Sequence, residues 1–282
     1  MQWDRAKNFM LLFFLIVNVF LAAIIRYEAN AYTLTREREN AIQAVFAQNN
    51  INMYYQIPRH FVPMRALQVS GYDYDIDRML AIFFPHGAEI SHTGDSRRDE
   101  FTYGDSRLII RDRYIFFVSG LNVTGVPDQN AAIALTQEFV DEHYPNFALD
   151  IQSTRQARRG GLRIFYRQVY QGQIIHTNFL EFLITGSGDD LVIEEVDIHY
   201  VRPIGFAYMP RELVGSDEAL LTFVQYIRPH SYEPVLIRHM DIVYFQSVYD
   251  TGNFNYAEPT YRIFIEGQDE PFLINAYTNR MH

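Results

Sequence analysis

The sequence predicts an α+β protein with one N-terminal transmembrane helix, followed by a tandem of modules that each combine a helix with an antiparallel sheet. An uncharged apolar run from Phe9 to Ile25 predicts the transmembrane helix. An aromatic content of 15% and abundant β-branched residues favour sheets, and helical patterns are twice followed by strand patterns. The hydrophobic content of 48% is sufficient for a folded core.

The apolar run from Phe9 to Ile25 contains 17 residues and no charged side chain. A helix needs roughly 20 residues to cross about 30 Å of hydrocarbon, so this run is near the lower limit for a span. We expect residues 9–25 to form the span and residues 1–8 to form a short tail.

Charged and aromatic residues around the run predict its orientation. Arg5 and Lys7 precede it, with Trp3 at a position typical of an interfacial aromatic, whereas Arg26 and Glu28 follow it with no net charge. The positive-inside rule therefore predicts a cytoplasmic N-terminus, a single pass through the cell membrane and an extracellular remainder.

A cleaved signal peptide is the alternative interpretation of this segment. Ala29, Asn30 and Ala31 have the small-x-small pattern of a cleavage site. However, the apolar run exceeds the roughly 7 to 15 residues of a signal core, and charged residues separate it from the pattern. We therefore expect a retained anchor.

Asn18 lies near the middle of the predicted span. A side-chain amide that faces lipid is unfavourable and usually finds a polar partner on another helix, so Asn18 is a candidate contact with a transmembrane partner. A single Asn in a very apolar helix can also be tolerated without a partner. The span alone is compatible with both interpretations.

Residues 26–125 are predicted to form a stalk helix and a first α+β region. Apolar residues that follow Thr35–Asn40 have helical spacing, which predicts a helix rising from the membrane. Prolines interrupt residues 51–125, where Leu108–Asp112 and Tyr114–Ser119 have the composition of two short strands.

A second module is expected at residues 126–205. Asp128 can cap a helix that ends near His143–Pro145. Four strand-like segments follow and predict an antiparallel meander: Phe147–Gln156, Leu162–Gln171, Ile174–Ile184 and Leu191–Val201.

The same order of elements recurs in a third module at residues 206–282. Ser216 can cap a helix that carries Asp217 and Glu218 in its first turn, and Pro229 ends it. Three strand-like segments follow: Val235–Tyr249, Thr260–Glu266 and Phe272–Thr278. Little residue identity accompanies this repetition, which indicates tandem α+β modules.

Charge and cysteine content exclude several partners and chemistries. The net charge is −10, and beyond Asp4, Arg5 and Lys7 the chain has 33 acidic and 22 basic side chains. Such a surface repels nucleic acid and anionic lipid headgroups. The absence of Cys excludes disulfides, thiolate metal sites and Cys nucleophiles. We expect no cofactor and no metal.

Candidate metal ligands form no motif. The run Tyr72–Asp77 begins like a calcium loop, but Arg78 stands where Gly is needed and Phe84 where a bidentate Glu belongs. Alternation in this run favours a strand with one solvated face. The histidines lie in loops or strand-like runs and match no metal-binding spacing: His86, His92, His176, His199 and His239.

The chain also lacks a catalytic motif. Gly186–Gly188 is a Gly-Ser-Gly turn without the pattern of a nucleophile elbow. Glu194 and Glu195 are adjacent on a strand and would point to opposite faces, while Arg158 and Arg159 belong to a glycine-containing turn. We therefore predict a protein that is not an enzyme.

The N-terminus of the chain shares a pattern of residues with a known family. The pattern consists of Trp3, Arg5 and Lys7 before the span and Phe14, Leu15, Asn18, Phe20 and Leu21 within it. At these positions the chain resembles the YycI (WalI) family, Firmicute accessory proteins of the essential cell-wall two-component system that are related to YycH. The expected modules also look like PepSY units. The chain departs from the family by having Arg where Lys is common.

The resemblance implies a regulator without catalysis. In the family, the transmembrane helix associates with those of a sensor histidine kinase and of YycH, and this association tunes the kinase. The shared residues within the span are then the expected helix contacts, and those before it mark the membrane interface. The expected partners are the sensor histidine kinase and a YycH-like protein.

An alternative function treats the exported modules as the active part. They would form an extracellular PepSY-like unit that binds or inhibits a protease, with the span as a passive anchor. An envelope hydrolase is a third hypothesis, which the absence of a catalytic motif disfavours.

Overall fold

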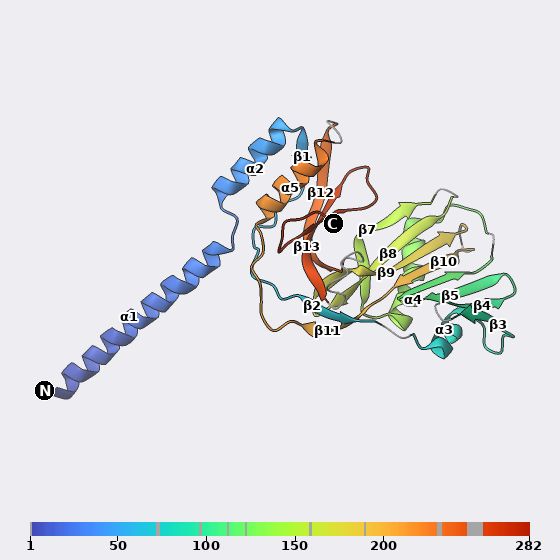
Figure 1. Ribbon diagram of the computed structural model, residues 1–282, viewed down its shortest axis with the longest axis horizontal. Helices are drawn as coiled ribbons and strands as arrows, with labels where there is room; N and C mark the ends of the chain where they lie inside the picture. The colour runs from blue at the N-terminus through green and yellow to red at the C-terminus, as the bar shows by residue number, and fades with distance from the viewer. Residues whose placement is uncertain are drawn as a thin grey trace. The chain divides into compact units, whose positions relative to one another are not determined.

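The computed structural model describes residues 2–71, 74–95, 98–111, 113–121, 123–157, 160–188, 190–229, 233–246 and 256–282. It has an apolar N-terminal helix and a mixed α+β remainder with a large sheet rich in antiparallel pairs, which confirms the predicted class at this level (Figure 1). The chain divides into two compact units. Unit 1 comprises residues 1–64, 210–241 and 261–282, and unit 2 comprises residues 65–209 and 242–260.

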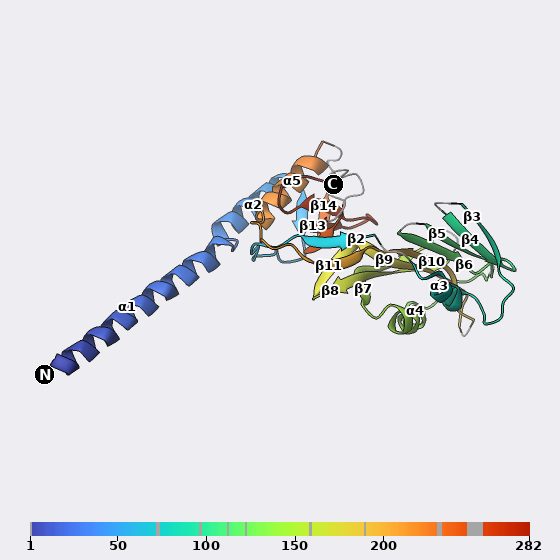
Figure 2. The same cartoon turned by 60° about the horizontal axis from the view of Figure 1, so that its bottom comes forward.

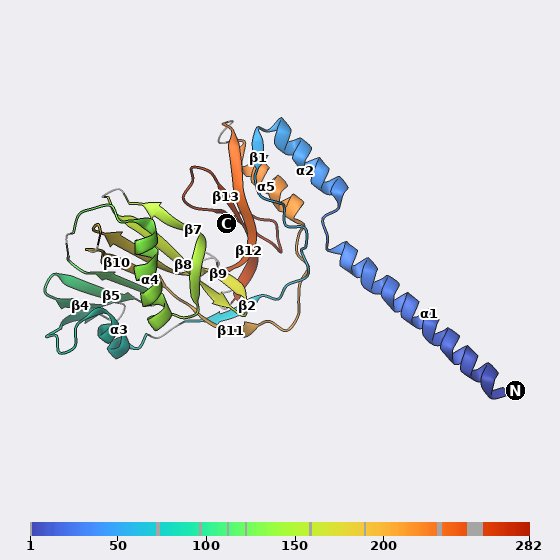
Figure 3. The same ribbon diagram turned by 180° about the vertical axis from the view of Figure 1, so that it is seen from behind.

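Unit 1 begins with two successive helices. α1 spans Gln2–Ala31 and α2 spans Arg36–Gln48, where the Thr35 side chain caps the helix by accepting a hydrogen bond from the Arg38 amide at 3.4 Å. This confirms the helix expected after Thr35. α2 lies beside α5, Ser216–Ile227, as Figures 1 and 3 show.

The strands of unit 1 pack with α2 and α5 around an apolar interior. β1 (Ile51–Met53) pairs in parallel with β12 (Val235–Phe245), and β13 (Tyr256–Ile265) pairs with β12 and with β14 (Phe272–Asn275). β12 and β13 also contribute residues to unit 2. The helices bury apolar side chains at intervals of three and four residues, as an amphipathic helix requires: Ile42, Phe46, Leu220, Phe223, Val224 and Ile227.

Unit 2 contains a run of strands in which every neighbouring pair is antiparallel. In spatial order these are β7 (Phe147–Gln156), β8 (Leu162–Tyr170), β9 (Gln173–Thr185), β10 (Val192–His199), β6 (Tyr114–Val118), β5 (Ser106–Arg111), β4 (Arg98–Tyr103) and β3 (Ser91–Asp95). A further antiparallel pair joins β2 (Leu67–Ser70) to β11 (Arg202–Phe206).

One face of this sheet is covered by helix α4, Gln129–His143 (Figure 2). Asp128 caps α4 by accepting hydrogen bonds from two backbone amides at 3.0 Å. Alternate residues of the strands point toward α4 and form the core, and Thr136 on α4 hydrogen-bonds Tyr166 on β8 at 2.9 Å. The short helix α3, Ile76–Phe83, adds Met79 to this core.

Several sequence predictions in unit 2 are confirmed. The helix capped by Asp128 ends at His143, and the four following strands form the expected antiparallel meander, with each end within two residues of its predicted place. The strands expected at Leu108–Asp112 and Tyr114–Ser119 are β5 and β6.

Some predicted strand limits are wrong. β12 ends at Phe245 within the expected Val235–Tyr249, whose residues 247–249 lie outside the described part. β13 begins at Tyr256 instead of Thr260, and so includes Pro259. In a sequence, a proline usually predicts the end of a strand. A strand nevertheless tolerates proline at a position where no hydrogen bond from the backbone nitrogen is needed. β14 ends at Asn275 and not at Thr278, because Asn275 Oδ1 accepts hydrogen bonds from two following backbone amides in a turn.

Each compact unit combines separate segments of the chain, whereas the modules expected at 26–125, 126–205 and 206–282 are contiguous. β6 pairs with β10, with Ile115 opposite Ile198, so strands from two expected modules share one sheet. β1 pairs with β12, which brings residues 51–53 into unit 1. Pairing between strands far apart in the chain decides this grouping.

Candidate functional site

The predicted span lies within the long helix α1. Its segment Arg5–Arg26, 22 residues, is long and apolar enough to cross a membrane, and none of it is buried in the protein. A membrane anchor and a signal sequence both have these properties. The backbone remains helical through the Ala29–Ala31 pattern.

Asn18 forms a hydrogen bond within its own helix. Its amide nitrogen donates to the Phe14 carbonyl oxygen, one turn earlier, at 2.7 Å. This contact satisfies one of the two N–H groups and lowers the cost of placing the amide in lipid. Among the residues that the structure describes, Oδ1 of Asn18 has no hydrogen-bond donor. The amide therefore retains an acceptor for a group on another chain.

The helical geometry divides the expected contact residues between two sides of α1. With about 100° per residue, Phe14, Leu15 and Leu21 lie within about 60° of Asn18 around the helix axis. Phe20, two residues from Asn18, lies about 200° away and thus on the opposite side. Each of these four apolar side chains is at least 49% exposed. One helix face therefore combines three of them with Asn18 and leaves out Phe20.

The residues expected at the membrane interface all lie in the first two turns of α1. Trp3 is 80% exposed, and Arg5 and Lys7 are also exposed. Trp3 and Lys7 are four residues apart and share one side of the helix, while Arg5 lies on the other. The two cations thus lie on different sides of the N-terminal end of α1.

Residues that follow α1 are bonded to the rest of unit 1. The Leu34 amide donates to the Arg59 carbonyl at 2.7 Å, and the Phe61 amide donates to the Tyr32 carbonyl at 3.0 Å. Thr33 forms an antiparallel bridge with His60. Residues 32–34 thus form a short extended strap between α1 and α2, and the strap is tied to the folded unit.

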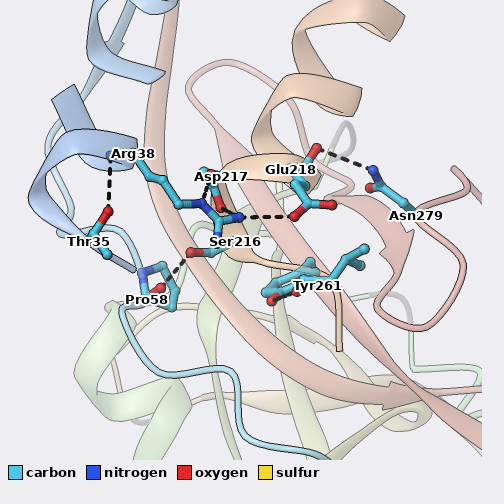
Figure 4. Close-up of polar contacts among 9 residues, drawn as sticks. Thr35, Arg38, Pro58, Ser216, Asp217, Glu218, Tyr261 and Asn279 are labelled. Atoms are coloured by element: carbon cyan, nitrogen blue, oxygen red, sulfur yellow. Dashed lines mark hydrogen bonds and ion pairs between the residues drawn. The ribbon is translucent and has the colours of Figure 1, made fainter. Parts of the chain in front are cut away.

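An arginine of α2 joins the two packed helices of unit 1 (Figure 4). Arg38 donates from Nε and Nη2 to the two carboxylate oxygens of Asp217, both at 2.7 Å, and from Nη2 to Oε1 of Glu218 at 2.9 Å. The guanidinium carbon also lies 5.7 Å from the ring centroid of Phe61. The Asp217 side chain is 11% exposed, so its negative charge depends on this bidentate partner.

The first turn of α5 is shaped around this ion pair. Gly215 is the N-cap, and a Cβ there would lie 2.5 Å from Oδ1 of Asp217 and 2.6 Å from Nη2 of Arg38. Ser216, the expected cap, is the first helical residue, so that prediction was wrong. Its hydroxyl donates instead to the Pro58 carbonyl at 2.6 Å, because the helical backbone turns the side chain away from the cap position.

Two further contacts fix this turn to the strands and the C-terminal segment. Tyr261 on β13 donates to the Val214 carbonyl at 2.6 Å, and Nδ2 of Asn279 lies 3.5 Å from the Glu218 carbonyl (Figure 4). Burial and the nearby carboxylates of Asp217 and Glu218 raise the pKa of Tyr261, which keeps its hydroxyl as a donor. The start of α5 is thus held from three directions.

Sequence reasoning missed the role of Arg38. Arg38 belongs to the charged run Thr35–Asn40, and charged side chains on a helix are usually solvated. Asp217 and Glu218 favour the positive end of the helix dipole, so their position at the start of α5 requires no partner. The two partners are 179 residues apart. The single available signal was two adjacent carboxylates on a helix whose next turns are almost wholly apolar.

The remaining candidate metal ligands serve structural roles. Asp75 caps α3 by accepting a hydrogen bond from the Arg78 amide at 3.1 Å, so the expected strand at Tyr72–Asp77 was wrong; Tyr72 and Asp73 lie outside the described residues. A short polar side chain before an apolar helical segment favours this cap. Among the described residues, no three His, Asp or Glu side chains are placed to hold a metal ion.

The histidines are placed in local contacts. His92 lies 2.8 Å from Oδ1 of Asp99 and stacks on Phe101, and His199 lies 2.7 Å from the Thr177 carbonyl. Burial lowers the pKa of His199. His176 and His239 lie within β9 and β12, as expected, and His86 is exposed between α3 and β3.

Adjacent glutamates on β10 do not form a carboxylate pair. Glu195 accepts a hydrogen bond from Arg163 on β8 at 3.0 Å, on the sheet face opposite the α4 core. Gly186–Gly188 is part of the connection between β9 and β10, as expected, and Arg158 and Arg159 lie outside the described residues.

No family model and no curated protein matches this chain. Among solved structures it is similar to an uncharacterized protein from Eubacterium rectale ATCC 33656, with a TM-score of 0.51. The match covers 82% of this chain and 88% of that chain at 11% sequence identity, so the likeness is one of fold.

Proposed function

We propose that this protein is a membrane-anchored accessory regulator of the sensor histidine kinase of a cell-wall two-component system. α1 spans the cell membrane with its N-terminus in the cytoplasm, and the chain that follows α1 lies outside. Within the bilayer, α1 contacts helices of the kinase and of a YycH-like partner. The N-terminal resemblance to the YycI family supplies the identity of these partners.

The observation that carries the proposal is the Asn18 face of α1. Phe14, Leu15 and Leu21 surround an amide whose Oδ1 has no donor within the described part of the chain, and no other element covers this face. A packed helix can supply a donor to such an acceptor, whereas lipid cannot. This supports a helix contact over a tolerated lone Asn.

The junction between α1 and the rest of unit 1 supports a regulatory role over a passive anchor. The strap at residues 32–34 is tied to residues 59–61 by backbone hydrogen bonds, and Arg38 then connects α2 to α5. A shift of α1 must therefore strain these contacts or move with them. A flexible tether would lack such contacts.

The substitution Asn18→Leu tests the proposal in full-length protein. We expect co-purification with the kinase to fall about three- to thirty-fold, because an interhelical hydrogen bond is worth roughly 0.6–2 kcal/mol. Kinase-dependent transcription should change in parallel. Leu makes the helix more apolar, so a failure to insert does not explain a loss of binding.

Phe20→Leu is the matched control, because Phe20 lies on the opposite side of the same helix. It should leave co-purification and transcription unchanged. Equal effects of the two substitutions, or no effect of Asn18→Leu on either measurement, would count against a contact through the Asn18 face.

A second candidate function is an extracellular PepSY-like unit that binds or inhibits a protease. It is favoured by the order of α4 and the β7–β10 meander, a helix followed by four antiparallel strands. Replacement of residues 5–26 by an unrelated transmembrane helix separates the two proposals. Retained regulation favours the extracellular unit, and lost regulation with normal surface expression favours α1.

A further inference from the structure

Unit 2 contains a cavity between α3, the end of α4 and the sheet. Its volume is about 280 Å³. Met79 from α3, Phe147 from β7 and Gln168 from β8 line it, and these three side chains are buried. Since an ordered water occupies about 30 Å³, the cavity suits a molecule of roughly ten non-hydrogen atoms.

Aromatic side chains line much of the cavity. Tyr74, Tyr144 and Tyr200 contribute rings, and the Phe147 ring packs edge-on against Tyr144 at a centroid distance of 6.0 Å. Tyr74 donates to the Arg113 carbonyl at 2.9 Å, which fixes its ring in place. Such fixed rings can stack on a planar or ring-shaped ligand at little entropic cost.

Exposed Arg78 also lines the cavity, and it forms no ion pair within the described part of the chain. Arg78 of α3 donates from Nη2 to the carbonyl of His143, the last residue of α4, at 3.0 Å. Within the described residues no carboxylate lies within ion-pair distance of Arg78, and its other guanidinium N–H groups have no acceptor. In a chain of net charge −10, an arginine that lines a cavity and has no acidic partner among the described residues is available to an anion.

Gln168, a buried polar residue that lines the cavity, can orient a ligand. Oε1 of Gln168 accepts a hydrogen bond from Asn178 at 2.5 Å, and Nε2 of Gln168 lies 3.4 Å from the Tyr200 hydroxyl. This bond fixes the orientation of the carboxamide. The lining thus combines aromatic walls, a directed amide and one cation, which is the usual composition of a small-molecule site.

We infer that this cavity binds a small ring-containing carboxylate, with the ring between the tyrosines and the carboxylate on Arg78. A guanidinium presents parallel N–H donors that match the two oxygens of a carboxylate. The site lies in unit 2 and does not depend on the proposed membrane contact. It would give the exported part of the chain a ligand of its own.

Phenylacetate and phenylacetamide are suitable probes, because they have the same size and ring and differ in charge. Both are titrated into full-length protein in nanodiscs and observed by ligand NMR, with empty nanodiscs to correct for partitioning. We expect phenylacetate to bind with a Kd of about 1 mM or tighter and phenylacetamide at least about tenfold more weakly.

Three variants identify the site. Arg78→Gln should abolish the preference for phenylacetate, and Asn146→Phe should block both probes, because exposed Asn146 lines the cavity and its side chain makes no hydrogen bond among the described residues. Arg111→Gln, at an exposed arginine of β5, should change neither affinity.

The inference is overturned if phenylacetate does not bind at about 10 mM. It is also overturned if the two probes bind equally, or if Arg78→Gln and Asn146→Phe leave the binding of phenylacetate as it is in the unaltered protein.

Discussion

The pKa of the Asp197 carboxyl in unit 2 depends on its burial and on the charged side chains around it. Burial and the nearby charges of Glu181 and Glu195 raise its pKa to about 6, against the hydrogen bond from Tyr114 and the charge of Arg163, which lower it. Arg163 is itself shared between Glu181 and Glu195, so it cannot fully compensate a third carboxylate. The folded protein therefore binds a proton at Asp197 more tightly than the unfolded chain does.

This shift predicts a pH-dependent contribution to stability. A raised folded-state pKa means that the contribution is present below about pH 4 and is lost as pH rises to about 6. The substitution Asp197→Asn removes the titration and keeps an acceptor for Tyr114. Relative to the unaltered protein, its free energy of unfolding should rise by about 1 to 2 kcal/mol between about pH 4 and pH 6, after allowance for partial exposure.

Urea unfolding of full-length protein at a series of pH values measures this difference. Asp105→Asn, at an exposed turn residue between β4 and β5, is the control. Its free energy of unfolding should vary with pH in the same way as that of the unaltered protein. A difference between Asp197→Asn and the unaltered protein that does not vary with pH would contradict the assigned cause.

The residues of the candidate contact face were only partly predictable. The apolar run correctly predicted a helix around Asn18, and helical periodicity then separates Phe20 from the Asn18 face. The hydrogen bond from Asn18 to Phe14 is local and follows from the helix itself. The proposed contact would be made with a second chain, so the identity of that chain stays a prediction from the resemblance.

At the scale of helices, the Arg38 ion pair is the clearest link between α2 and α5. Loss of Arg38 would leave Asp217 largely buried without its partner, and an uncompensated buried charge is strongly unfavourable. Arg38 is itself 37% exposed, so water moderates the effect. The link lies one turn beyond the strap that follows α1.

We predict that Arg38→Gln lowers the free energy of unfolding of unit 1 by about 1 to 3 kcal/mol. Arg36→Gln on the same helix should have an effect within about 0.5 kcal/mol, since Arg36 is exposed and makes no ion pair among the described residues. Thermal unfolding of the two full-length variants gives the comparison. Equal stability of the two variants would show that the Arg38 contact contributes nothing.

At the scale of the whole molecule, local signals predicted elements better than their assembly. The Asp128 cap and the turn residues between strands correctly predicted α4 and the β7–β10 meander, with their ends nearly in place. The pairing of β6 with β10 and of β1 with β12 was not predicted. Strand partners are selected by packing across the whole sheet, and a strand's own sequence carries little of that information.

In the proposed regulator, α1 would act through the strap at residues 32–34, which is hydrogen-bonded to residues 59–61, and through the α2–α5 pair that Arg38 joins. The fold alone does not specify this role, because the Eubacterium rectale protein that shares the fold is 11% identical and uncharacterized. The proposed role therefore depends on a contact made by the Asn18 face.

In-membrane photo-cross-linking from position 18, compared with position 20, tests this claim most directly. A photoreactive residue is placed at each position in full-length protein in living cells, and the captured chains are identified by mass spectrometry. We expect capture of the sensor histidine kinase or a YycH-like protein from position 18, and several-fold less from position 20. Capture of neither partner from position 18, or equal capture from both positions, would show that the Asn18 face does not make the proposed contact.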